Sequence, residues 1–143
     1  MTATNNDFQQ QMYETGIQQI FTSALPAATT IPAGTLAMAD SSGRPVQFVD
    51  STYQGGGIGF LGVASVRYVN SDASNPVNKR AMFLRNTSAI LLGKSGDAPD
   101  ATLLGLPVYV ADNITCKKTK TTGDLAVTLL EVLGNNRFRV WIA

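Results

Sequence analysis

The end of the chain carries the pattern that most narrows its possible folds: two runs of alternating side chains around a short turn. The runs cover residues 128–133 and 137–142, and Gly-Asn-Asn at 134–136 separates them. Glycine and asparagine tolerate the positive φ angles of hairpin turns. Alternation is typical of a strand with one buried face. The sequence therefore predicts a β-hairpin whose second strand buries one parity, namely Phe138, Val140 and Ile142.

Short apolar runs bounded by turn residues recur from residue 31 onward. The runs 34–39 and 45–49 flank a turn at 40–43, and 106–110 is followed by 114–116, which pairs plausibly with it. We count about eight strands of this kind and no strongly signalled interior helix. Such a pattern is typical of two-sheet or barrel folds. We therefore predict an all-β fold, a jelly-roll-like β-sandwich or small barrel, over residues 31–143.

Residues 1–30 differ from the rest, because they are rich in glutamine and contain no Lys or Arg. Their apolar side chains have spacings that fit an amphipathic helix, whereas Gly16 and the angular spread of these side chains favour an extended arm that orders against a partner. We favour the arm, or a short helix within it, and treat 1–30 as an N-terminal arm and linker. Its apolar residues are the predicted partner interface: Phe8, Met12, Tyr13, Ile17, Ile20 and Phe21.

Composition argues against most chemical functions. The chain has no histidine, which removes the commonest general base and metal ligand. Cys116 is the only cysteine, so an internal disulfide is impossible. A net charge of +1 provides no field that would attract nucleic acid or an anionic membrane. We predict no enzymatic activity, no catalytic residue, no metal or cofactor, no direct nucleic-acid partner and no membrane segment.

Three clusters have ordinary structural interpretations. Asp97 and Asp100 share a loop in which aspartates serve as turn acceptors. The glycines within 55–59 lack the following helix and lysine of a phosphate-binding loop. The basic cluster is predicted to be a solvated hairpin tip, and its members are Lys117, Lys118 and Lys120.

Several segments resemble the small head decoration, or cement, proteins of tailed bacteriophages. The segments are 31–40, then 62–64 after a stretch rich in glycine, then 105–112, and finally the strand after Gly123 with the terminal hairpin. The resemblance covers roughly residues 31–143 and rests on glycines, a Val-Tyr pair and spacing. It implies a β-sandwich or jelly-roll subunit that binds the outside of the capsid and cements neighbouring major capsid proteins. It carries over no catalytic residue.

The resemblance fixes the expected partners and location. We expect the major capsid protein and further copies of the chain as partners, with a homodimer favoured and a homotrimer as the alternative. A charged content of only 15% suits a surface that packs against others. We expect synthesis in the host cytoplasm, since no signal peptide is visible, and residence on the capsid exterior of the virion. The alternative function is a phage tail or fibre module that binds a host-surface carbohydrate.

Overall fold

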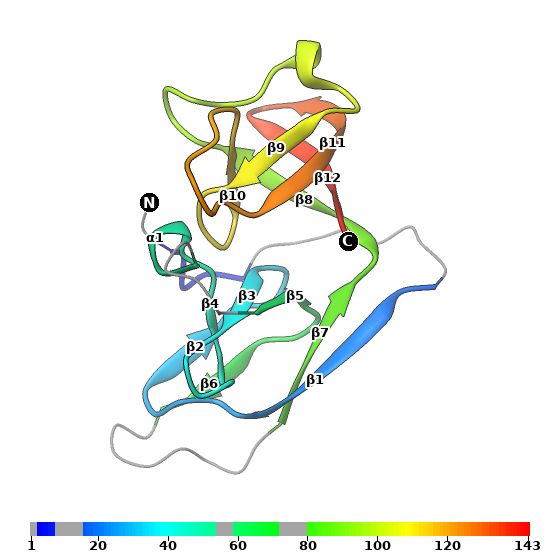
Figure 1. Ribbon diagram of the computed structural model, residues 1–143. Helices are drawn as coiled ribbons and strands as arrows, with labels where there is room; N and C mark the ends of the chain where they lie inside the picture. Colours follow the sequence, from blue (N-terminus) through cyan, green and yellow to red (C-terminus); the bar gives the residue numbers. More distant parts are fainter. Residues whose placement is uncertain (1–2, 8–15, 54–58, 72–79) are drawn as a thin grey trace.

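The computed structural model describes residues 3–7, 16–53, 59–71 and 80–143. The all-β prediction is confirmed, because β-strands dominate these residues and the helical elements are single turns (Figure 1). The described residues form twelve strands rather than about eight. Four of the strands have only three residues, which is too short for alternation to reveal them.

The N-terminal part of the fold is an antiparallel sheet with strand order β1-β7-β5-β3-β4, accompanied by the two-stranded ribbon β2-β6. The single-turn helix α1, Asp50–Tyr53, follows β4 in the chain. The sheet lies in the lower part of Figure 1, in blue to green. Its strands and those of the ribbon are β1 (Gln18–Ala24), β2 (Thr29–Ile31), β3 (Leu36–Ala39), β4 (Pro45–Gln47), β5 (Phe60–Ala64), β6 (Tyr68–Asn70) and β7 (Arg80–Arg85).

The C-terminal part is a small closed barrel with strand order β10-β8-β12-β11-β9. Strand β10 runs parallel to β8, and the other pairs in the barrel are antiparallel. Closure leaves the barrel without an open edge. Its elements are β8 (Thr87–Gly93), the 3-10 turn η1 (Ala101–Leu103), β9 (Pro107–Val110), β10 (Thr115–Lys117), β11 (Ala126–Gly134) and β12 (Arg137–Ile142).

Sheet and barrel are joined by a short chain connection and by a shared buried cluster. Only Asn86, at φ 56°, separates β7 from β8, so the chain passes directly from one part into the other (Figure 1). The loop before β10 is fixed to the sheet, since the Leu36 N–H donates to the Asn113 carbonyl at 2.8 Å. A shared buried cluster contains Phe48 and Val63 from the sheet side and Leu91, Val140 and other barrel residues.

The predicted C-terminal hairpin and the positive φ angles of its turn residues are confirmed. The terminal hairpin is formed by β11 and β12, and Asn135 and Asn136 occupy its turn at φ 53° and 56°. Strand β5 bends at Gly62, whose φ is 121°. The register between β3 and β5 shifts beside it, as a β-bulge requires.

The helical alternative for the N-terminal segment is wrong for residues 18–24. These residues form β1, which pairs with β7 in the register Ile20↔Phe83. Helical spacing of the apolar residues is therefore misleading here. Tertiary pairing decides between helix and strand when a short segment satisfies both patterns weakly.

Candidate partner-binding surfaces

Strand β1 forms the outermost strand on one side of its sheet. It pairs with β7, and no strand among the described residues pairs with its other edge (Figure 1). Gln18 and Gln19 are exposed, and Phe21 is 57% exposed. This edge is a candidate surface for partner binding, and β1 contains two of the predicted interface residues, Ile20 and Phe21.

The predicted interface residues do not share one face. Phe8, Met12 and Tyr13 lie outside the described residues. Ile20 packs against the smaller buried cluster of the sheet, whereas Phe21, its neighbour, points to the opposite face, as consecutive strand residues do. Ile17 precedes the strand and is half-buried. Phe21 is therefore the one described member of the set that is largely open to a partner.

The Arg80 side chain packs over the exposed Phe21 ring. The Arg80 guanidinium carbon lies 5.7 Å from the ring centroid, within the range of a cation–π interaction. Strands β1 and β7 place these residues side by side, with Ala24↔Arg80 in register after a bulge. The ring is thus held on the surface rather than folded into the core.

The opposite edge of the sheet is protected. Strand β4 contains Pro45, which has no N–H to offer a further strand. The Gln47 amide Nε2 donates to the Thr30 carbonyl at 2.8 Å and to Asn5 Oδ1 at 2.9 Å. A proline and a covering side chain are two of the devices by which proteins block open edges. Edge pairing is therefore favoured at β1 rather than at β4.

The barrel carries four exposed apolar side chains near η1 and β11, which we call the barrel patch: Leu104, Leu106, Leu130 and Val132. Each of the four side chains is between 40% and 49% exposed. The Leu129 N–H donates to the Leu106 carbonyl at 3.0 Å, so the segment after η1 runs beside β11. A bulge between Leu129 and Glu131 turns Leu130 outward. Sequence reasoning missed this patch, because strict alternation does not anticipate a bulge.

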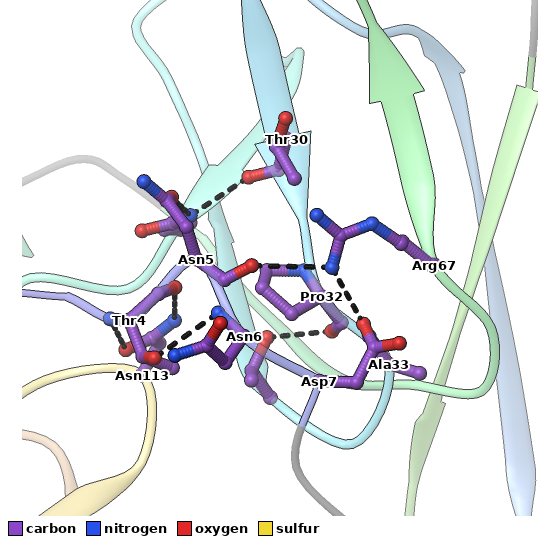
Figure 2. A network of polar contacts seen from close by, with 11 residues as sticks. Thr4, Asn5, Asn6, Asp7, Thr30, Pro32, Ala33, Arg67 and Asn113 are labelled. Carbon is purple, nitrogen blue, oxygen red and sulfur yellow. Dashed lines mark hydrogen bonds and ion pairs between the residues drawn. The ribbon is translucent and has the colours of Figure 1, made fainter.

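The N-terminal segment of residues 3–7 is docked across the fold (Figure 2). The Thr4 N–H donates to Asn113 Oδ1 at 3.0 Å, and Asn113 Nδ2 donates to the Thr4 carbonyl at 3.1 Å. Asn113 is fully buried in the loop between β9 and β10. One amide side chain thus binds both main-chain groups of a residue 109 positions away.

Asp7 fixes the other end of the same segment. Its Oδ1 accepts from Arg67 Nη1 at 2.8 Å and from the Ala33 N–H at 2.9 Å. The pKa of Asp7 lies below its ordinary value. The main cause is the hydrogen bond from Arg67, and the second is the hydrogen bond from the Ala33 N–H, since both stabilise the ionised carboxylate. Arg67 also donates to the Asn5 carbonyl at 3.1 Å. The segment therefore bridges the barrel loop and the sheet through these hydrogen bonds.

A groove of about 560 Å³ opens beside the docked segment. Its lining combines apolar side chains with neutral hydrogen-bonding ones and a single carboxylate, Asp40. A volume of this size lies within the range of small-molecule sites. The lining residues come from the docked segment, β2, β3, β4 and α1 and their flanks: Asn5, Ala28, Thr29, Thr30, Met38, Asp40, Val46, Gln47, Val49 and Thr52.

The predicted basic cluster is not a uniform hairpin tip. Lys118 and Lys120 are exposed, but Lys117 is buried, with Nζ 3.0 Å from Asp124 Oδ2 and 3.6 Å from Asp50 Oδ2. The expectation of a solvated cluster is therefore wrong for Lys117. Lys117 is the last residue of β10, and its side chain points inward to two carboxylates. The arrangement ties α1 to the turn before β11.

The remaining candidate groups have structural partners. Burial raises the pKa of the Cys116 thiol to about 12, which keeps it protonated and unreactive at neutral pH. Asp100 caps η1 through the Thr102 N–H, and Asp97 accepts from the Thr119 hydroxyl at 2.8 Å. Among the described residues, no group of three or more Cys, Asp or Glu side chains could hold a metal ion.

Comparisons with known proteins supply no relative: no family model, no curated protein and no solved structure matches the chain. Within the described parts of the chain, no helix is long and apolar enough to cross a membrane.

Proposed function

We propose that the chain is a virion structural protein that binds the outside of a phage capsid and cements neighbouring major capsid proteins. The observation that carries the proposal is the presence of two exposed apolar surfaces on separate parts of one small fold. They are the β1 edge with Phe21 and the barrel patch. A protein that bridges neighbours needs more than one contact surface, and monomeric proteins rarely expose large apolar side chains in groups.

Many shallow contacts suffice for this role. Each contact between one copy and the shell is weak on its own, but contacts that act together raise the effective concentration of the next one. The low charge of the chain favours such packing, because neighbouring copies repel one another little. The proposal includes residence on the virion exterior, association with further copies of the chain, and no enzymatic activity.

Co-sedimentation with phage heads that lack the chain tests the proposal. Wild-type protein is expected to move with assembled heads in a gradient, and the double variant Leu106→Asp/Leu130→Asp is expected to remain at the top. The matched control is Val66→Asp, since Val66 is a single exposed apolar residue in the turn between β5 and β6. Wild-type protein that ignores heads, or a double variant that binds as well as the control, contradicts the proposal.

The groove supports a second candidate function, a tail or fibre module that binds a host-surface carbohydrate. Its threonine, asparagine and glutamine side chains match the neutral hydrogen-bonding groups of sugars. Aromatic platforms are absent from its described lining, which weakens this candidate. Reproducible glycan-array hits that are abolished by Thr30→Val and retained by Val66→Asp would favour it over the cement role.

A further inference from the structure

Among the described residues, the outer edge of β1 carries neither of the two devices found at β4, a proline and a covering side chain. Its sequence, Gln-Gln-Ile-Phe-Thr-Ser-Ala, contains no charged residue and no proline over seven positions. Natural edges are blunted by lysines, prolines, bulges or covering side chains, and an edge without them is a template for pairing with another chain. Strand β1 has a bulge after Phe21, but no described strand pairs with the outer edge of its regular part before the bulge. The β4 edge of the same sheet is protected by Pro45 and by the Gln47 side chain, so the two edges of this sheet differ.

We propose that β1 pairs antiparallel with β1 of a second copy about a two-fold axis, which makes the sheet continuous across a dimer. The strand suits its own copy as an occupant because it is neutral. Two-fold pairing brings each residue near its counterpart, so a charged edge would place like charges opposite one another. Here glutamines, an isoleucine and a phenylalanine meet instead.

The bulge in β1 limits the register of this pairing. Pairing with β7 is regular from Gln18 to Phe21 and shifts before Ala24, so the regular part of the edge is Gln18–Phe21. The proposed two-fold axis is perpendicular to the sheet, so one residue of β1 must lie directly opposite the same residue of the second copy. Gln19 and Ile20 lie at the centre of the regular part and are the candidates for this residue. With either one, Gln19 lies opposite Gln19 of the second copy or one diagonal step away.

The pairing gives both faces of the strand a partner. Gln19 and Phe21 share the exposed face, so each Phe21 ring packs beside a glutamine of the other copy. Ile20 faces the smaller buried cluster of the sheet, so two such clusters become continuous below the axis. The exposed Phe21 ring and the half-buried Ile20 thus both gain cross-strand contacts.

The inference rests on the proposed function only in that it names one of its partners, and its test uses the purified full chain without heads. Sedimentation equilibrium is measured for wild type, Gln19→Lys, Gln19→Glu, their equimolar mixture, and Val66→Lys as a surface control. Wild type and control are expected to form dimers. Each Gln19 variant alone is expected to dissociate up to about fivefold more readily, and the mixture is expected to return to the wild-type dissociation constant.

Three results would overturn the pairing. Wild-type protein that remains a single chain at every concentration excludes the dimer. A dimer that neither Gln19 variant weakens must use another surface. If the Gln19 variants weaken the dimer and their mixture does not restore it, the substitutions damage the strand and the Gln19 side chains of the two copies do not face each other. Co-sedimentation with heads by a protein that fails this test would leave the proposed function standing.

Discussion

Asn113 binds Thr4 by both main-chain groups, accepting from its N–H at 3.0 Å and donating to its carbonyl at 3.1 Å. A backbone pair normally makes such contacts in a sheet, but here a fully buried side chain makes them. The relationship attaches the start of the chain to the barrel loop, while Asp7 attaches it to the sheet through Arg67. The N-terminal segment is therefore part of the folded unit at residues 4–7.

Removal of the Thr4 N–H should destabilise the protein measurably. The Thr4→Pro variant leaves buried Asn113 Oδ1 without its donor, which costs about 1–3 kcal/mol. The Thr4→Ala variant keeps both main-chain bonds and serves as the matched control. Urea unfolding is expected to give a lower midpoint for proline than for alanine. Equal midpoints would mean that the docked segment adds nothing to stability.

The Asp7 carboxyl should titrate below its ordinary pKa of 3.8. Because the folded-state pKa is lowered, ionised Asp7 stabilises the docked segment fully above pH 3.8. That contribution disappears as the pH falls through the lowered pKa. Carboxyl NMR titration is expected to show this midpoint, and Arg67→Ala is expected to move it back toward 3.8. A wild-type midpoint at or above 3.8 would contradict the docked geometry.

Alanine at Gly62 should be strongly destabilising, whereas alanine at Gly59 should be tolerated. A Cβ at Gly62 would collide with the Leu84 carbonyl oxygen, and its φ of 121° is strained for any L side chain. Nothing lies within 4 Å of a Cβ at Gly59. We expect a loss of at least about 2 kcal/mol in the free energy of unfolding for Gly62→Ala alone. Similar losses for the two variants would argue against the close approach of β5 and β7.

Lys117→Met should destabilise the fold, and Lys118→Met should not. Loss of the buried ammonium removes the cation that Asp50 shares with Asp124, whose side chain is fully buried. Breaking a buried ion pair in this way costs about 3–5 kcal/mol. The Lys118 side chain is exposed, so its replacement controls for loss of charge. Calorimetry of both variants at neutral pH measures the difference, and equal transition temperatures would refute the structural role of Lys117.

The outer edge of β1, which no described strand covers, could not be predicted from the sequence. Phe21 was assigned to a partner interface from its apolar character, and the structure leaves it exposed. The helical spacing of the apolar residues does not describe Phe21, because pairing with β7 makes residues 18–24 a strand. Three of the six predicted interface residues lie outside the described chain, so that part of the interface remains a prediction.

Local pattern alone determined the hairpins, the all-β class and the turn residues. Strand parity and the positive φ of Asn135 and Asn136 depend only on near neighbours in the chain. Tertiary structure decided which sheet edge stays open, that Lys117 turns inward, and that Asn113 receives Thr4. Those outcomes depend on contacts between residues as far as 109 positions apart, and no periodicity in the sequence encodes such contacts.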